Sequence, residues 1–252
     1  MVSVTKRINQ IKQPRGGYVN PKEFEVITYD DGIELYEDEN VHASLIGLAV
    51  DYLTRYMMGE KSVSDVFKIS LSGAKLIGET KHAMQLLEDI KGLDDKSIIN
   101  ACKLSGYDVC FRAGIMGYRP VEDILADKNT ISNIKIMVNR SLTFWEKYGP
   151  VTKVGATFEG GYTDIVSSGD CDYLTKDTLW DFKVSKTAPR NKYTLQLLMY
   201  YIMGCHSIHD EFQDIKCLGI YNPRLNKVYL CELSDIKPEI IEEVERVVIG
   251  YE

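Results

Sequence analysis

The sequence predicts an α/β (α+β) protein in which helices flank a central mixed sheet and the N-terminal half is helical. Three observations support this prediction. Apolar residues recur at helical spacing over residues 39–148, short strand-like segments dominate 153–184, and a helix, two strands and a last helix follow. A sheet covered by helices is the arrangement that best buries elements in this order. With 44% hydrophobic residues, a chain of 252 residues can fill a sizeable core.

The first 38 residues are predicted to form an N-terminal arm and a short hairpin. Residues 1–22 are polar and interrupted by proline and glycine, a pattern typical of an arm. Residues 23–36 resemble two short strands around Asp30-Asp31-Gly32, which is a hairpin turn signal.

Residues 39–149 are predicted to be a helical region that packs on the rest of the chain as one compact unit. Apolar spacing predicts a long helix over 39–59, which Gly59 ends. Further helices are expected at 62–75, 79–91, 96–104, 107–115 and 130–148. This region could clamp DNA, form a dimer interface or act as a lid, and the sequence leaves the three roles open.

Residues 150–252 are predicted to form the sheet core. The expected strands are 154–158, 162–166, 172–174, 179–184, 215–221 and 227–232, with helices at 191–205 and 236–248.

Composition narrows the functional classes. The net charge of −7 argues against a surface coated with basic residues for nucleic acid, although a local basic strip remains compatible with a nuclease. No apolar run approaches eighteen residues and no apolar segment follows the N-terminal charges, so neither a membrane span nor a secretory signal is expected. The six cysteines are scattered without a C-x-x-C pair, which indicates buried thiols in a reducing cytoplasm.

One stretch, residues 169–183, carries the most chemical information. It predicts two short strands joined by a turn, with Asp172 on the first strand and Asp181 and Lys183 on the second. Because strand side chains alternate, Asp181 and Lys183 point the same way and Phe182 points to the opposite layer. Paired strands would bring Asp172 beside Asp181. Two carboxylates and a lysine at one point suit a Mg²⁺-type ion and phosphodiester hydrolysis.

Alternatives to this interpretation remain open. The segment could be a surface hairpin with its charges in water, yet the apolar residues around Asp181 predict a packed face. A carboxylate and a lysine on a central strand are costly to bury unless they are paired or bind a metal. Asp170 faces the same side as Asp172, and Glu159 and Asp164 are other candidate acids.

The helix at 191–205 adds polar groups near this stretch. Gln196 and Tyr200 lie four residues apart and share a helical face, where they could bind a phosphate or a water. Lys186, Arg190 and Lys192 form a basic strip that could hold a nucleic-acid backbone, although a solvated face is the better explanation of such a strip taken alone.

These residues resemble the PD-(D/E)XK nuclease superfamily, in particular its RecB-like and phage-exonuclease-like branch. The resemblance rests on Gly169-x-x-Asp172, then Asp181-Phe182-Lys183, then Gln196 and Tyr200 on the next helix, and it covers residues 150–232. It implies that Asp172, Asp181 and the backbone carbonyl of Phe182 bind the metal. It also implies that Lys183 positions the attacking water, and that Gln196 and Tyr200 steady the site and the scissile strand.

The branch often adds a histidine ligand from an early helix in a G-x-x-x-H context. Here the matching segment is Gly47 to Asp51, so an aspartate stands in place of the histidine. Asp51 could bind a hard cation such as Mg²⁺, or it could form an ordinary ion pair with Arg55 four residues on. We assign a capping or core role to His42, earlier on the same helix.

The resemblance therefore predicts an exonuclease-like, Mg²⁺- or Mn²⁺-dependent deoxyribonuclease of phage or mobile-element origin, with single- or double-stranded DNA as substrate. A homo-oligomer and a protein partner both remain open. The alternative is a catalytically inactive protein of nuclease fold that binds nucleic acid or a protein partner, such as a host protein.

Overall fold

The computed structural model describes residues 1–59 and 62–252, which form two compact units. The first unit combines Met1–Tyr29 with Trp145–Glu252, and the second spans Asp30–Phe144. The helix α8 (Lys128–Tyr148) runs across the boundary between them. Residues 1–29 therefore fold with the C-terminal part of the chain, which no local pattern in the sequence indicated.

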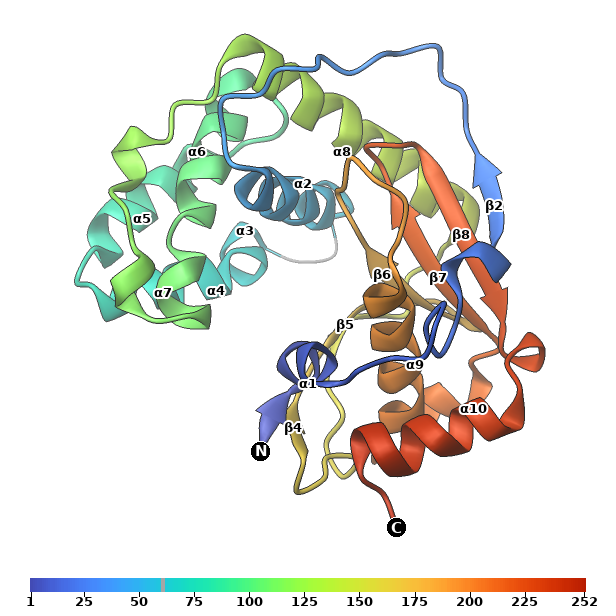
Figure 1. Cartoon of the computed structure of the whole chain (residues 1–252). Helices are drawn as coiled ribbons and strands as arrows, with labels where there is room; N and C mark the ends of the chain where they lie inside the picture. The colour runs from blue at the N-terminus through green and yellow to red at the C-terminus, as the bar shows by residue number, and fades with distance from the viewer. Residues whose placement is uncertain (60–61) are drawn as a thin grey trace. The chain divides into compact units, whose positions relative to one another are not determined.

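The first unit is built on a six-stranded sheet, which confirms the predicted central mixed sheet (Figure 1). The strand predicted at 162–166 is not one of its strands, because only Val166 of that segment is in a strand and it belongs to β4 (Val166–Ser168) of a separate two-stranded sheet. The pairings of the six-stranded sheet are antiparallel except that of β6 with β7, and α9 connects these two strands. A parallel pair needs a long crossover, which a helix of this length supplies. The strands, in spatial order, are β2 (Glu25–Thr28), β8 (Lys227–Glu232), β7 (Cys217–Asn222), β6 (Thr178–Phe182), β5 (Cys171–Leu174) and β3 (Lys153–Ala156).

Both faces of the central strand β6 are covered, so all five of its residues are buried. The helix α9 (Asn191–Cys205) packs on one face and shares a core with Leu179 and Leu218. On the opposite face, the Trp180 ring contacts the rings of Trp145 and Tyr148 from the end of α8. Burial on two sides is the reason that β6 is largely apolar apart from Thr178 and Asp181.

The predicted N-terminal arm is part of the first unit's core. Strand β1 (Val2–Ser3) pairs in parallel with β4 (Val166–Ser168), and α1 (Val4–Gln10) packs on α9. Val4 and Ile8 lie one helical turn apart and are buried, which provides the apolar stripe for this contact. The prediction of a polar arm missed this helix, because seven residues are too few to show helical periodicity clearly.

The predicted hairpin over residues 23–36 is wrong. Strand β2 pairs with β8 from the far end of the chain, and no residue between 31 and 36 is in a strand. The Asp30 and Asp31 side chains accept hydrogen bonds from the N–H groups of Gly32 and Ile33. These two aspartates therefore make local turns, and β2 finds its ladder on an existing sheet edge instead.

The second unit is helical, as predicted. Its helices are α2 (Ala43–Met57), α3 (Val63–Val66), α4 (Lys68–Leu76), α5 (Thr80–Glu88), α6 (Asp95–Ser105), α7 (Asp108–Arg112) and the greater part of α8. The helix predicted over 62–75 is divided at Phe67, where α3 ends and α4 begins. The buried carboxylate of Asp108 accepts hydrogen bonds from Tyr52 and Ser70, which fixes three of these helices together.

Shorter elements complete both units. The helix predicted at 236–248 is α10 (Pro238–Glu243) followed by a π-helical segment, Val244–Ile249. Single 3₁₀ turns lie at Pro21–Glu23, Ile115–Gly117, Val121–Asp123, Asp210–Asp214 and Leu233–Asp235. In the part of the chain that the structure describes, no helix has both the length and the apolar character needed to cross a membrane.

Candidate functional site

The two strands of the 169–183 segment pair as predicted. Strands β5 and β6 are antiparallel, with Tyr173 opposite Trp180 and Leu174 opposite Leu179. The same register continues to Asp172 and Asp181, so the two carboxylates share one face of the hairpin. The pairing of neighbouring strands is therefore what brings the two acids together.

Asp181 is a buried carboxylate that is paired with Lys183. It is 2% exposed, and its Oδ1 accepts a hydrogen bond from Lys183 Nζ at 2.6 Å. Its Oδ2 is buried and has no hydrogen-bond partner among the residues that the structure describes. Burial raises the pKa of Asp181 to about 6, with Lys183 opposing the rise and Asp172 adding to it.

Lys183 follows Asp181 by two residues, and its side chain lies on the same face of the sheet, as the strand alternation predicts. Its side chain is 26% exposed, so the ammonium lies at the boundary between the buried carboxylate and solvent. Burial alone would lower the pKa of Lys183, but the carboxylates of Asp181 and Asp172 outweigh burial and raise it. The lysine is therefore charged at neutral pH.

Asp172 is tied to the backbone of the neighbouring strand. Its Oδ2 accepts a hydrogen bond from the Phe182 N–H at 2.8 Å, which fixes the carboxylate at the end of β6. The Phe182 ring lies on the opposite face, near the rings of Tyr173 and Tyr221. Asp172, Asp181 and the Phe182 backbone thus belong to one corner of the sheet.

The predicted helical pair lies on α9 above this corner. Gln196 Nε2 donates a hydrogen bond to Tyr200 OH at 2.8 Å. Tyr200 is 5% exposed, and its pKa is well above its usual value because of burial first and then Asp172 and Asp181. The Tyr200 ring also lies beside the start of β5, because its Cε1 is 3.3 Å from the position of a Cβ on Gly169.

Gly169, the glycine of the G-x-x-D pattern, has a steric reason to be glycine. A Cβ at this position would meet Val4 Cγ2 at 2.8 Å and Tyr200 Cε1 at 3.3 Å. Tyr200 itself stacks on Phe158 with ring centroids 5.3 Å apart. The glycine thereby leaves room for the aromatic ring whose hydroxyl reaches the site.

The three basic residues that the sequence placed beside the site are exposed. Lys186 lies after β6, Arg190 immediately precedes α9, and Lys192 lies in its first turn. The Lys192 ammonium is 4.8 Å from the centroid of the Tyr193 ring. Their exposure is compatible with binding to a backbone phosphate, which stays a prediction.

Asp51 lies in the second unit, on α2, and forms the ion pair that the sequence offered as its alternative role. Arg55 contacts Asp51 through Nε and a terminal nitrogen, each at 2.9 Å. His42 caps α2, because its Nδ1 accepts a hydrogen bond from the Ser44 N–H. The metal role of Asp51 stays a prediction.

The other candidate acids have different surroundings. Glu159 binds Thr157 and His209, while Asp170 and Asp164 are exposed. Over residues 1–59 and 62–252, no three histidine, cysteine, aspartate or glutamate side chains gather as a metal site. The donors at the corner of the sheet are therefore two carboxylates with a backbone carbonyl nearby.

Sequence reasoning missed Tyr193. Its ring centroid is 5.4 Å from Lys183 Nζ, within the range of a cation–π contact. The spacing could have indicated it, because residues 193, 196 and 200 follow the i, i+3, i+7 pattern of one helical face.

Comparisons of this chain with protein-family models, with curated proteins and with solved structures find no match.

Proposed function

We propose that this protein is a metal-dependent nuclease that hydrolyses DNA phosphodiester bonds. One observation carries the proposal: Asp172, Asp181 and Lys183 converge at one corner of the sheet, where Asp181 Oδ2 is buried without a donor. A purely structural ion pair would leave that oxygen's desolvation uncompensated, which is costly. A cation at this point would compensate it.

The residues present fit a hard divalent cation. Asp172 and Asp181 supply carboxylate oxygens, and the Phe182 carbonyl belongs to the same corner, so these groups would hold Mg²⁺ or Mn²⁺. Such an ion supplies stabilisation of the negative charge that develops on the phosphodiester.

The remaining groups supply a cation and hydrogen-bond donors. Lys183 carries its positive charge beside Asp181, where it would orient the attacking water and offset negative charge. Tyr200 keeps its proton at neutral pH and already accepts a hydrogen bond from Gln196. Its O–H is therefore a donor, suited to a phosphate oxygen.

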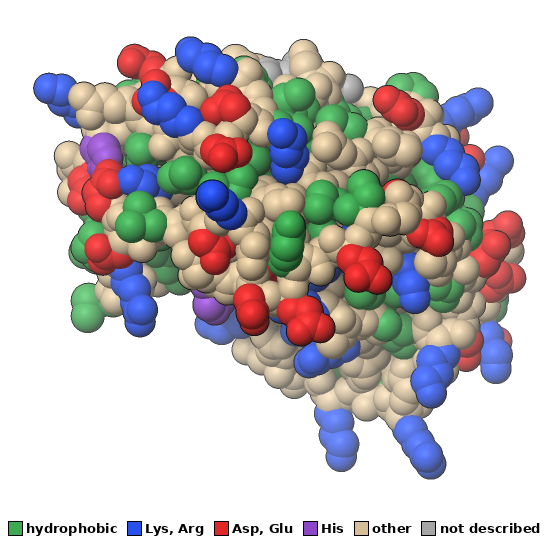
Figure 2. All heavy atoms as spheres, turned by 90° about the horizontal axis from the view of Figure 1, so that it is seen from above, with side chains coloured by type: hydrophobic (Ala, Val, Ile, Leu, Met, Phe, Trp, Pro, Cys, Tyr) green, Lys and Arg blue, Asp and Glu red, His purple; other side chains and the backbone are tan. Residues whose placement is uncertain are grey.

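The expected substrate follows from charge and from the resemblance. Lys186, Arg190 and Lys192 are exposed on the chain between Lys183 and the first turn of α9, where they would contact backbone phosphates. The face in Figure 2 mixes acidic and basic side chains, in keeping with a net charge of −7. Binding to DNA would thus depend on a few local cations. The resemblance adds exonuclease-like action and an origin in a phage or mobile element.

The decisive experiment is cleavage of linear double-stranded, single-stranded and circular DNA with Mg²⁺, Mn²⁺ or EDTA. Lys183→Ala should lower the cleavage rate by roughly a hundredfold or more, the usual effect of removing one charge stabiliser. Lys237→Ala removes an exposed lysine of the same unit and should cleave like the wild type. Circular dichroism would show that both variants are folded. Full activity of folded Lys183→Ala would refute the proposal.

A second function is favoured by the internal partners of the carboxylates. Asp172 binds the Phe182 N–H and Asp181 binds Lys183, so part of the donor set is satisfied within the protein. A protein of nuclease fold that binds nucleic acid or a protein partner without catalysis would keep this network for stability. Salt-dependent DNA binding without metal-dependent cleavage would favour this function.

A further inference from the structure

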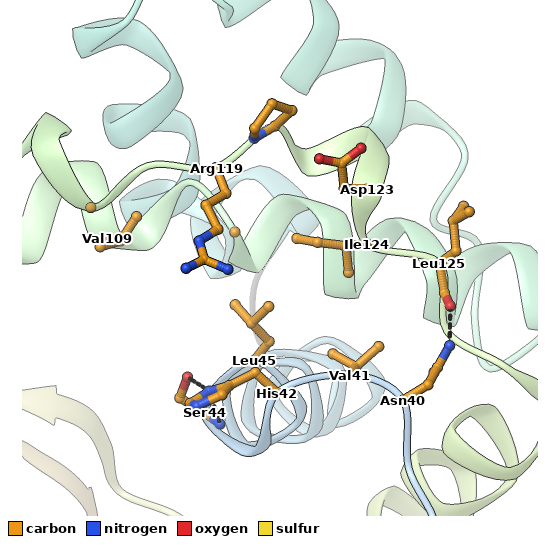
Figure 3. A pocket seen from close by; sticks show the side chains of 13 residues that line it. Asn40, Val41, His42, Ser44, Leu45, Val109, Arg119, Asp123, Ile124 and Leu125 are labelled. Carbon is orange, nitrogen blue, oxygen red and sulfur yellow. Dashed lines mark hydrogen bonds between the residues drawn. The ribbon is translucent and has the colours of Figure 1, made fainter.

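The second unit contains a pocket that the proposed chemistry does not use. Its volume is about 650 Å³, within the range of small-molecule sites. It lies between the start of α2 and the segment 117–125 (Figure 3). Val41, Leu45 and Ile124 belong to its apolar lining.

Arg119 places a positive charge in this pocket. Its side chain extends across the pocket toward Leu45 and Ser44 in the first turn of α2 (Figure 3). Among the residues that the structure describes, no carboxylate pairs with its guanidinium. An unpaired guanidinium beside apolar walls is a strong donor for a planar or tetrahedral anion.

The segment that carries Arg119 is fixed on both sides. Tyr118 OH donates a hydrogen bond to Glu79 at 2.9 Å, and Glu122 binds His82 at 2.7 Å and also Lys103. These contacts attach the residues around Arg119 to α5 and α6. The backbone on both sides of the exposed Arg119 is therefore fixed, so binding would have to order only its side chain.

The opposite wall is equally fixed. Asn40 Nδ2 donates to the Leu125 carbonyl at 2.7 Å, and Asn40 Oδ1 accepts from the Asp127 N–H at 2.9 Å. Leu125 is 63% exposed at the rim and adds apolar surface to the entrance. These hydrogen bonds hold the chain before α2 against the end of the 117–125 segment.

A histidine adds a second donor. His42 Nδ1 accepts from the Ser44 N–H, so the neutral ring carries its proton on Nε2. His42 also lines the pocket, on the side toward which Arg119 extends. Donors from two segments thus border the same end.

Asp123 restricts the charge of the ligand. Its carboxylate also lines the pocket but points away from the guanidinium, at the far side of Ile124 (Figure 3). A second negative charge on a ligand would be repelled there. We propose that this pocket binds an organic monoanion with an apolar body, whose charged group contacts Arg119 and whose body packs on Leu45 and Ile124.

The test is binding of 8-anilinonaphthalene-1-sulfonate, an apolar aromatic with one sulfonate, to the full chain. Fluorescence gives the affinity, and amide NMR shifts of Gly106 and Gly117, which line the pocket, give the location. Arg119→Gln should weaken binding about tenfold or more, the scale of one charge-assisted hydrogen bond. Arg246→Gln, which removes an exposed arginine of the first unit, should leave binding unchanged.

Three competitors with the same naphthalene body separate the contributions of charge. 1-Naphthoate should displace the probe, neutral 1-naphthalenemethanol should do so much more weakly, and 1-naphthyl phosphate should gain affinity in Asp123→Asn. Equal binding of the alcohol and the acid would overturn the proposal, as would unchanged affinity in a folded Arg119→Gln. Shifts confined to residues outside the pocket would overturn it as well.

Discussion

Gly169→Ala gives the most direct test of how the core shapes the candidate site. The added Cβ would lie 2.8 Å from Val4 Cγ2, 3.3 Å from Tyr200 Cε1 and 3.5 Å from Phe158 Cε2. Ordinary carbon contacts are about 3.5–4.0 Å, so the Val4 methyl must move by roughly 1 Å. Val4 is fully buried and β-branched, which limits that movement.

The expected cost follows from two opposing effects. Overpacking a filled core costs about 1–3 kcal/mol, while replacing glycine restricts the unfolded chain and returns about 0.4–1 kcal/mol. We therefore expect Gly169→Ala to lower the free energy of unfolding by about 1–2 kcal/mol. Val4→Ala alone should cost about 2–3 kcal/mol because it removes two buried methyl groups and leaves a cavity.

The double variant makes the reasoning falsifiable. Val4→Ala removes the methyl group that the new Cβ would meet, so Gly169→Ala should cost about 1 kcal/mol less in that background. Urea denaturation of the wild type, both single variants and the double variant measures this coupling. If the stability lost in the double variant equals the sum of the losses in the two single variants to within about 0.3 kcal/mol, the steric account of Gly169 is refuted.

Three further predictions concern other parts of the structure. Thr194→Val removes a buried hydroxyl that donates to the Val19 carbonyl at 2.6 Å, so it should cost about 1–2 kcal/mol and speed proteolysis before residue 20. Asn133→Ala removes the amide that binds both the N–H and the carbonyl of Tyr36, and should cost about 2–3 kcal/mol by thermal or urea unfolding. Burial raises the pKa of Asp108, so the stability that its protonated form contributes is present below the unfolded pKa of 3.8 and is lost as pH rises through the folded pKa. Asp108→Asn should remove that loss of stability. The measurement is the free energy of unfolding of both proteins as a function of pH, and a difference between them that does not change with pH above 3.8 would contradict the prediction.

The residues assigned to the candidate site differ in how far their positions support a role in cleavage. The structure brings together Asp172, Asp181 and Lys183 through strand pairing and a direct hydrogen bond, with the Tyr200 ring beside Gly169. The paired state of Asp51 with Arg55 offers a sufficient reason for that aspartate without a metal. Activity of an Asp51→Asn variant equal to that of the wild type would assign it to the helix surface.

Local elements, and the face on which each of their side chains lies, could be predicted from the sequence. The helix predicted at 191–205 and the strand predicted at 227–232 have those bounds in the structure. Asp181 and Lys183 share a face because a strand has a period of two, and Gln196 and Tyr200 do because a helix turns every 3.6 residues. These relations depend only on backbone geometry, which a short stretch of sequence already contains.

The relations between distant segments could not be predicted in this way and are visible only in the folded chain. Strand β2 pairs with β8, about two hundred residues away, because a sheet edge stabilises a short strand better than an isolated hairpin does. The burial of α1, the orphaned oxygen of Asp181 and the pocket around Arg119 likewise arise from packing. Such features depend on which surfaces meet, and local periodicity contains no information about that choice.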